Sequence, residues 1–416
     1  MRRSVKLKYC LRSSDSGTWG DEADGVDAVP VLRSTEISLD GSVDSREPAL
    51  RSLSRREEAR TRLHEGDILV VRSSGSDLHL GKSGYVDGAA SGMSFSNFLQ
   101  RLRVEGTHSP RFVWYFLNSS DAKQQIRKLS STTTGLQNLS AALIAELQIA
   151  TPSPGEQRRI ADFLDAATAR IDELTALRRR QAVLLRERAD RKLAGLFSDT
   201  AGRRQFRLRH LMRSNPCYGV LVPRFSHEGV PLIRVSDLGR LRQELDRLPK
   251  IETRQAVEYR RTRVSSGDLL ITVVGATIGR CDVASEEVDG FNVSRAIARV
   301  QLIPELSPHM MAAWVRGRQF RVQAELVTSG AAAQPALNMS DLAHFTIWLP
   351  ETATEWADLA REVSEHEDVT NRLLGVVDAQ LSLLAERRQA LITAAVTGQF
   401  EVSTASGRNV VDGVAS

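Results

Sequence analysis

The side chains most suited to binding chemistry lie in a short segment, Gly81-Lys82-Ser83. A Gly-Lys-Ser triplet can close a phosphate-binding loop, but that loop needs a second glycine five positions upstream, where this chain has Ser76. The triplet therefore predicts no nucleoside-triphosphate site. A small, basic loop that carries a hydroxyl group can still hold a phosphate through its backbone amides and its cation, whereas the plain alternative is a hairpin loop.

A loop of the same kind recurs as Gly275-Ala276-Thr277-Ile278-Gly279-Arg280, with Gly279 standing 198 positions after Gly81. Both loops follow a strand-like run and combine small residues with a hydroxyl group and a cation. We therefore predict that both loops, with the strand ends before them, contact a nucleic-acid backbone. The predicted contacts are Arg72, Ser73, Ser74, Lys82 and Ser83 in the first copy, and Thr272, Thr277 and Arg280 in the second.

Two further polar loops occupy matching positions. The stretch Arg111–Leu129 predicts a helix, which the loop Ser131–Asn138 follows; the counterpart of this loop is Ser329–Asn338. Gln and Asn can bond bidentately to adenine, and Ser and Thr can reach bases or phosphates. The side chains predicted to contact DNA are Thr133, Thr134, Gln137, Asn138, Gln334 and Asn338. A solvated loop without a ligand is the open alternative.

A framework segment, Pro30–Ile37, returns as Pro231–Leu238, 201 positions later. Its polar members in the two copies are Arg33, Ser34 and Thr35, then Arg234 and Ser236. These residues are predicted either to contact DNA phosphate or to pair internally, with Glu36 in the first copy and Asp237 in the second. The sequence leaves both alternatives open.

These recurrences belong to a duplication of a whole domain and the helix that follows it. Gly66-Asp67-Ile68-Leu69 returns as Gly267-Asp268-Leu269-Leu270 at the same step of 201 residues. Leu184–Arg188 returns as Leu383–Arg387, after 199 residues. This period is far longer than the roughly 20–50 residues of solenoid units. Two similar domains related by a pseudo-twofold axis suit a two-part target on duplex DNA.

One further segment, Asn215-Pro216-Cys217-Tyr218, is similar to the Asn-Pro-Pro-Tyr motif that holds a flipped adenine in N6-adenine methyltransferases. Cys217 interrupts the proline pair, and no glycine-rich fingerprint for a cofactor precedes it. The first copy has Ser14-Asp15-Ser16-Gly17 at this place. We therefore interpret the segment as a turn and predict no catalytic residue.

The composition is that of an ordinary globular chain. The 416 residues carry a net charge of +5, with 41% hydrophobic and 26% charged residues. The weak basic excess, nearly all arginine, permits nucleic-acid binding, although a compositional bias of the genome explains it equally well. The three cysteines lack zinc or disulfide spacing, and no apolar run is long enough to span a membrane. We therefore expect a cytoplasmic protein without a bound metal.

Two long helices follow the duplicated domains. Ser153-Pro154-Gly155-Glu156 is a capping box that starts the first, and Thr352-Ala353-Thr354-Glu355 starts the second. Apolar residues recur at alternating steps of four and three, which predicts a coiled-coil seam. At about 1.5 Å per residue, each helix would extend for roughly 65 Å. The predicted seam residues are Ile160, Leu164, Ala167, Ile171, Leu174, Leu177, Leu185 and Phe197, then Leu359, Val363, His366, Thr370, Leu373, Val377, Gln380, Leu384, Arg387 and Leu391.

We thus expect an α/β protein of several domains. Two repeated α/β domains, residues 1–152 and 201–351, would be separated by two long helices, residues 153–200 and 352–399. The helices would pack as an antiparallel coiled coil and act as a ruler between the two domains. His366 is expected to be a packed seam residue, and residues 400–416 to be a disordered tail.

Several of these stretches resemble the specificity subunit of type I DNA restriction-modification enzymes, and the resemblance covers about residues 5–402. The stretches that carry it are Gly155–Asp165 with Thr168 and Ile171-Asp172, Glu386–Gln399, Pro30–Ile37 and Gly66–Leu69. The first two look like the conserved helices of that family, and the last two look like the framework of its target-recognition domains. The second helix departs from the family pattern where it has Glu355-Trp356-Ala357.

The resemblance implies a DNA-binding subunit that performs no chemistry itself. Each recognition domain would read one half of a bipartite site, while the paired helices set the gap and dock two methyltransferase subunits. Those partners would bind S-adenosylmethionine and methylate adenine at N6; restriction subunits that use ATP and Mg²⁺ are optional partners. The helix residues predicted to contact partners are Glu156, Gln157, Arg158, Phe163, Arg387 and Arg388.

Two functions from other classes stay open at this point. The chain could be a stand-alone adenine methyltransferase or nuclease, or a coiled-coil adaptor that contacts proteins without reading bases. A variant of the leading hypothesis directs methylation without an active nuclease partner.

Overall fold

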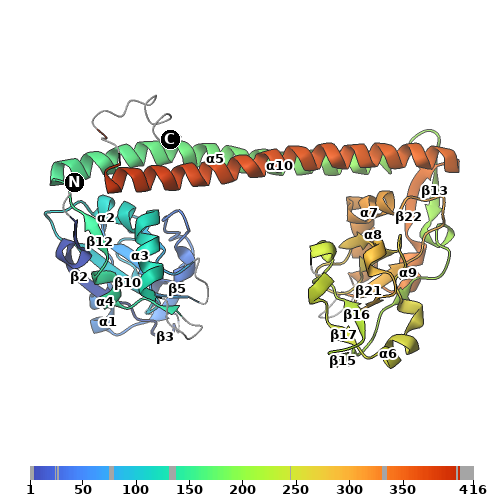
Figure 1. The fold of residues 1–416 in the computed structure, drawn as a ribbon, viewed down its shortest axis with the longest axis horizontal. Helices are drawn as coiled ribbons and strands as arrows, with labels where there is room; N and C mark the ends of the chain where they lie inside the picture. Colours follow the sequence, from blue (N-terminus) through green and yellow to red (C-terminus); the bar gives the residue numbers. More distant parts are fainter. Residues whose placement is uncertain are drawn as a thin grey trace. The chain divides into compact units, whose positions relative to one another are not determined.

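The computed structural model describes residues 4–23, 25, 28–74, 79–130, 137–243, 245–329, 335–399 and 402. The chain divides into two compact units (Figure 1). Unit 1 comprises residues 1–178 and 379–416, and unit 2 comprises residues 179–378. The predicted tail at 400–416 lies outside the described residues, apart from residue 402.

Unit 1 is built on two four-stranded sheets and four short helices. The first sheet is antiparallel, in the order β2 (Leu11–Ser16), β10 (Leu99–Val104), β6 (Ile68–Val71) and β8 (Ser83–Tyr85). The second has the order β3 (Asp21–Glu22), β5 (Ala49–Ser52), β4 (Ala28–Leu32) and β9 (Ser94–Phe95). Two strand pairs complete the unit: β1 (Ser4–Lys6) with β12 (Gln148–Ala150), and β7 (Ser73–Ser74) with β11 (Gln137–Asn138). The helices are α1 (Arg55–Thr61), α2 (Pro110–Leu117), α3 (Ser120–Ser130) and α4 (Ala141–Ala145).

Unit 2 repeats this plan strand by strand. Its first sheet has the order β14 (Cys217–Tyr218), β21 (Ile297–Val300), β18 (Leu269–Thr272) and β19 (Cys281–Val283). Its second has the order β15 (Phe225–Ser226), β17 (Lys250–Ile251), β16 (Val230–Ile233) and β20 (Asn292–Val293). The strand β13 (Arg203–Arg207) pairs with β22 (Thr346–Pro350). The helices are α6 (Thr253–Glu258), α7 (Pro308–Arg316), α8 (Arg318–Thr328) and α9 (Met339–His344).

The central strands explain where the cores form. All four residues of β6 are buried, and alternate side chains enter different clusters: Ile68 and Val70 enter one, Leu69 and Val71 the other. Side chains of a strand alternate between faces, so both faces of this strand are covered. The matching strand β18 is likewise fully buried and feeds two clusters.

One element that the sequence predicts as continuous is broken: Arg111–Leu129 forms two helices, α2 and α3. The helices break at Asn118, whose amide donates to the carbonyl oxygens of Trp114 and Ser83 at 3.1 and 2.9 Å. Such side-chain bonds to the backbone compete with helix continuation.

The two long helices begin where the capping boxes place them, and the first ends at Leu196, four residues before the predicted 200. They are α5 (Pro154–Leu196) and α10 (Ala353–Thr397). Thr352 and Glu355 form the reciprocal bonds of a capping box, with the hydroxyl donating to the carboxylate at 2.7 Å. After α10, Gly398 adopts a φ of 77°, which a glycine accepts without strain. No helix among the described residues is long and apolar enough to cross a membrane.

Within each unit the two helices pack in opposite directions. In unit 1, Arg388 donates to Asp172 at 3.1 Å, and the last turns of α10 share a core with Ile160. In unit 2, His366 donates to the carbonyl oxygen of Ala189 at 3.3 Å. The predicted fold class, two α/β domains with long antiparallel helices, is confirmed. His366 is half-buried in the helix pair, as expected.

The predicted seam is wrong in its middle. Leu174 and Leu177 are 41% and 60% exposed, and Leu373 and Arg387 also face solvent. In α5 the buried residue after Leu164 is Thr168 rather than Ala167. Ile171 is buried as predicted, so the register is restored there; after Ile171 a step of four to the half-buried Thr175, in place of three, rotates the seam by one residue and moves Leu174 and Leu177 outward. Downstream, the buried positions are Ala182 and Ala189.

Candidate nucleic-acid interfaces

Four separate segments of unit 1 form one hydrogen-bonded surface, which we call platform 1. Its segments are residues 14–17, 72–74, 97–100 and 137–139. The backbone of Arg72 joins three of them: its N–H donates to the carbonyl of Phe98 at 3.0 Å, and its carbonyl accepts from Leu139 at 2.7 Å. The fourth joins through Gly17, whose N–H lies 3.4 Å from the carbonyl of Leu99.

Platform 1 brings together the two loops that the sequence proposes separately. In the β7–β11 pair, Asn138 lies opposite Ser73 and Gln137 lies opposite Ser74. Asn138 is exposed there, and the Arg72 guanidinium donates to the Ser16 hydroxyl at 3.0 Å. Thr133 and Thr134 of the same predicted loop lie outside the described residues, as does Gln334 in unit 2.

Unit 2 contains the equivalent surface, platform 2. Its segments are residues 217–220, 273–275, 294–298 and 335–338. Val273 donates to Ala296 at 2.9 Å and accepts from Leu337 at 2.8 Å, which repeats the role of Arg72. Val274 and Ala336 form an antiparallel bridge in place of the β7–β11 pair. The backbone construction is therefore the same in both units.

The exposed side chains of the two platforms differ. Asn97 in platform 1 is replaced by Arg295 in platform 2, and both are exposed. Ser16, opposite Gln100 in the β2–β10 register, is replaced by Tyr218, opposite Ala298. One backbone thus presents two chemically distinct surfaces, which is what two different DNA half-sites would require.

The Gly-Lys-Ser segment faces the interior of unit 1. The Lys82 ammonium donates to the carbonyl oxygens of Ser34 and Ile37 at 3.3 and 2.6 Å, and burial lowers its pKa. Ser83 is fully buried, and its hydroxyl donates to the carbonyl of Gly81 at 3.0 Å. Ser83 does not reach the surface, and the half-buried Lys82 has its ammonium engaged by two backbone carbonyls, so DNA contact by Lys82 stays a prediction. The first loop is anchored inward by its own cation.

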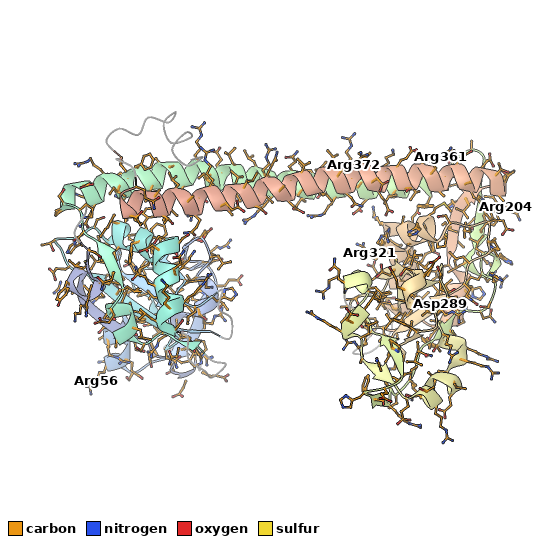
Figure 2. All side chains as sticks on the ribbon, viewed as in Figure 1. Arg56, Arg204, Asp289, Arg321, Arg361 and Arg372 are labelled. Atoms are coloured by element: carbon orange, nitrogen blue, oxygen red, sulfur yellow. The ribbon has the colours of Figure 1, made fainter. Side chains whose placement is uncertain are left out.

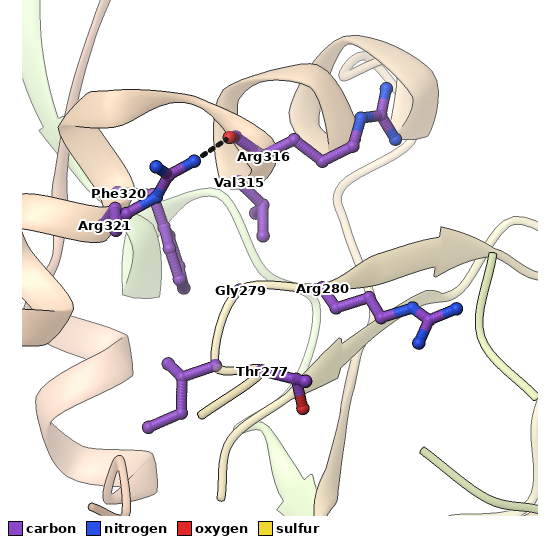
Figure 3. Close-up of a pocket in the computed structure, with 8 residues that line it drawn as sticks. Thr277, Gly279, Arg280, Val315, Arg316, Phe320 and Arg321 are labelled. Atoms are coloured by element: carbon purple, nitrogen blue, oxygen red, sulfur yellow. Dashed lines mark hydrogen bonds between the residues drawn. The ribbon is translucent and has the colours of Figure 1, made fainter. Parts of the chain in front are cut away.

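The corresponding loop of unit 2 is more open. Thr277 and Arg280 are exposed and line a pocket of about 300 Å³, together with α7 and α8 (Figure 3). Figure 3 shows the side chains of Arg280 and Arg316 extending to the same side of the view with their guanidinium groups apart, and Arg321 donates to the Arg316 carbonyl at 3.4 Å. The guanidinium groups of these arginines do not converge on one point, so the pocket does not form a binding site for an anion. Thr272, at the preceding strand end, is fully buried.

The framework arginines pair internally in both copies. Arg33 donates to Glu36 at 2.6 Å, and Arg234 donates to Asp237 at 2.9 Å. Both carboxylates are buried, and the adjacent hydroxyls of Thr35 and Ser236 donate to them as well. Burial would raise the pKa of Asp237, but the bonds from Arg234 and Ser236 lower it below its usual value. Of the two alternatives, the structure shows the internal pair.

Asn338 and Tyr218, from two further predicted segments, both lie in segments of platform 2. Asn338 is exposed and begins α9, with its amide 3.3 Å from Asp341. Tyr218 lies in strand β14 rather than in the predicted turn. Its hydroxyl donates to the carbonyl of Leu337 at 3.1 Å, and the Cys217 thiol donates to the carbonyl of Arg261. The second half of the methyltransferase-like motif, Cys217-Tyr218, is therefore part of platform 2.

The helix residues predicted to contact partners are not equally accessible. Gln157 is only 1% exposed, since its amide accepts from the Ser109 N–H at 2.9 Å and donates to the Pro152 carbonyl at 3.0 Å. It joins α5 to the domain and cannot meet another subunit. The other five are accessible to differing degrees: Arg158 and Arg387 are exposed, and Glu156, Phe163 and Arg388 are half-buried.

Sequence reasoning missed two exposed platform residues, Phe98 and Arg295. Neither lies in a polar loop or a basic run, which were the signals used. Aligning the two copies at the end of β9 and β20 would have placed Asn97-Phe98 against Arg295-Ala296. That difference, inside a conserved backbone, is the signal that could have found them.

Parts of the chain are similar to known proteins. Residues 56–185 match the model of a family described as the type I restriction modification DNA specificity domain. The EcoBI specificity subunit of Escherichia coli is 31% identical over 191 residues, which cover 43% of this chain and 39% of that protein. The EcoKI specificity subunit of Escherichia coli is 22% identical over 392 residues, 88% of this chain and 83% of that one. The chain is thus similar to the type I restriction-modification specificity subunits.

The first two curated matches span only part of those specificity subunits, 39% of EcoBI and 37% of the StySPI subunit of Salmonella potsdam. A solved structure from a study of complex assembly and conformational transition in a type I restriction-modification system covers 95% of this chain and 97% of its own. It has a TM-score of 0.68 at 18% identity, and so shows the same fold. The resemblance predicted from the sequence is thereby confirmed.

Proposed function

We propose that this chain is the DNA-reading subunit of a type I restriction-modification complex. Each unit would read one half of a bipartite DNA site through its platform. The observation that carries this proposal is the recurrence of one hydrogen-bonded platform in both units with different exposed side chains. Base edges differ in their pattern of donors, acceptors and methyl groups, so different side chains on one backbone would select different bases.

The proposal assigns the chemistry to partner subunits. Two methyltransferase subunits would bind S-adenosylmethionine and methylate adenine N6, and optional restriction subunits would use ATP and Mg²⁺. This chain would hold no cofactor and would act in the cytoplasm. Exposed arginines on the long helices, such as Arg158 and Arg387, offer positive charge for these partners. Figure 2 shows Arg361 and Arg372 on the outer surface of α10.

The deciding experiment is expression of the chain with the methyltransferase encoded beside it, in a host without DNA methylation. Genome-wide mapping of N6-methyladenine should then find one split motif, which disappears when this chain is omitted. A soluble complex without methylation would count against the pairing. Methylation by this chain alone would instead favour a stand-alone methyltransferase and would return attention to Asn215–Tyr218.

A domain exchange tests the modular part of the proposal. Replacing residues 1–152 with the matching domain of another specificity subunit should change one half of the motif and leave the other unchanged. A change in both halves would contradict independent reading. Inserting one heptad into either long helix should alter the gap or prevent assembly, because the helices would set the spacing.

Salt dependence separates DNA reading from a purely structural role. Contacts to phosphate release counterions, so binding by the assembled complex should weaken steeply as salt rises. An adaptor that only joins proteins through its helices would show no such sequence-dependent, salt-sensitive binding.

A further inference from the structure

Each platform exposes one large aromatic ring. Phe98 in platform 1 is 51% exposed, and Tyr218 in platform 2 is 40% exposed. Other phenylalanines of unit 1, such as Phe95 and Phe112, are almost completely buried. An exposed ring within a surface of polar groups has apolar area available for a ligand.

The two rings occupy different places on the shared backbone. The counterpart of Phe98 in platform 2 is Ala296, since both carbonyls accept the N–H of the residue that links the platform segments. The counterpart of Tyr218 in platform 1 is Ser16, by the strand register. The duplication has therefore kept one ring on each platform while moving its position. A ring needed only for packing would be expected at the same framework position in both copies.

Both rings are attached to ordered backbone. The carbonyl of Phe98 accepts from Arg72, and the Tyr218 hydroxyl donates to Leu337 at 3.1 Å. The hydroxyl is thus occupied within the platform, which leaves the ring as the part of Tyr218 available to a ligand. A ring held in this way loses little conformational freedom on contact with a partner.

We propose that Phe98 and Tyr218 are specificity-determining residues, each of which packs against the 5-methyl group of a thymine in its half-site. This inference rests on the proposed function. In the major groove the thymine methyl is the apolar feature of a base edge, and apolar side chains recognise it by contact. Each platform also carries an arginine: the Arg295 N–H donates to the carbonyl of Val220, two residues from Tyr218, and the Arg72 N–H donates to the carbonyl of Phe98. Their positive charge suits a polyanion. A half-site in which an adenine is methylated contains at least one A·T pair and hence a thymine.

The test removes the methyl group from the DNA rather than from the protein. Once the split motif is mapped, each thymine of the two half-sites is replaced in turn by deoxyuridine in a synthetic duplex. Affinity of the complete complex, with its methyltransferase subunits, is measured for each duplex. We expect one position in each half-site to lose about fourfold in affinity, the value of one buried methyl group.

Variants assign each position to its ring. F98A should abolish the deoxyuridine effect in one half-site only, and Y218A should abolish it in the other. Y218F is the matched control, because it loses the bond to Leu337 but keeps the ring, and so should stay sensitive to the missing methyl. Y9A removes an aromatic residue that is 68% exposed outside the platform and should leave both effects unchanged.

The outcomes distinguish this inference from the proposed function. If the motif is methylated but no deoxyuridine substitution weakens wild-type binding, the thymine contact is wrong while the function stands. The same conclusion follows if F98A and Y218A retain the full deoxyuridine effect. If no split motif is methylated at all, the proposed function itself fails.

Discussion

The two units are joined to their long helices by different chemistry. In unit 1, Arg111 donates to Asp162 at 2.5 Å and also to Asp165 on α5, and Tyr115 donates to Asp165 at 2.7 Å. Gln157 adds the buried bonds described above. These directional bonds supplement an apolar core that α5 enters through Ile160, Ala161 and Leu164, so the difference from unit 2 concerns the start of the helix.

Unit 2 uses aromatic burial at the equivalent place. Trp356 occupies the repeat position of Gln157, 199 residues later, and its ring lies edge-on to Phe206 with 5.7 Å between centroids. Its indole N–H donates to the Pro350 carbonyl at 2.8 Å, and Leu359 and Val363 continue the buried face. An ion pair, Arg316 with Glu367 at 2.6 Å, supplements this contact.

The start of the long helix therefore lies at the same place in both copies, but different interactions hold it to the domain. Polar attachment depends on geometry and on the charge of its members, whereas apolar attachment depends on filled volume. The stability of unit 1 should therefore fall when salt is added or a single bond is removed. The stability of unit 2 should fall when a cavity is made.

The largest effect is expected for Trp356→Ala. Removing a buried indole leaves a cavity and an unpaired carbonyl at Pro350, which should destabilise unit 2 by about 3 kcal/mol. Amide hydrogen exchange, followed peptide by peptide, should show the loss in unit 2 and not in unit 1. Trp356→Phe keeps most of the ring and should lose less than half as much. Equal destabilisation of both units would contradict the assignment of this contact to unit 2.

The next largest effect is expected for Gln157→Ala in unit 1. The Ser109 N–H would lose its partner inside the protein, and the cost should be about 2 kcal/mol. Exchange of amides in α2 should speed up, while peptides around Trp356 should be unchanged. Glu156→Ala, one position earlier and half-buried, is the matched control and should have a smaller effect.

A smaller, salt-dependent effect is expected for Arg111→Ala. Its side chain is 39% exposed, so solvent screens the pairs with Asp162 and Asp165, and the cost should be about 1 kcal/mol at low salt. High salt should reduce this difference from the wild type. Arg316→Ala is the control in unit 2 and should cost less, because Arg316 pairs with one carboxylate. A cost for Arg111→Ala that is independent of salt would show that packing dominates this contact.

The smallest effect concerns acid stability. Burial would raise the pKa of Asp15, but bonds from Arg101 and Ser13 outweigh it and hold that pKa below its usual 3.8. The stabilisation is therefore present above pH 3.8 and is lost as pH falls through the lower, folded value. Cys217 occupies this position in unit 2 and has no such acid titration. Asp15→Asn should cost unit 1 about 0.5 kcal/mol at neutral pH and flatten its acid response, as measured by exchange between pH 5 and 2.

Periodic and local features could be predicted from the sequence. The duplication follows from motifs that recur after 199 and 201 residues, and the capping boxes at Ser153 and Thr352 follow from residues close together in the chain. Helix starts depend on neighbouring side chains and backbone, so local patterns are sufficient to predict them.

The exposure of the site residues was decided by tertiary structure. Lys82 looked suited to phosphate but turns inward to two carbonyls of a segment more than forty residues earlier. Phe98 carried no polar or basic signal in the sequence, and it lies exposed next to the backbone of Arg72. The seam also shifted after Ile171, because the fit between the helices decides which face is covered. By itself the sequence determined the repeated framework and its family; contacts between distant segments decided which side chains each platform presents, because no local pattern encodes those contacts.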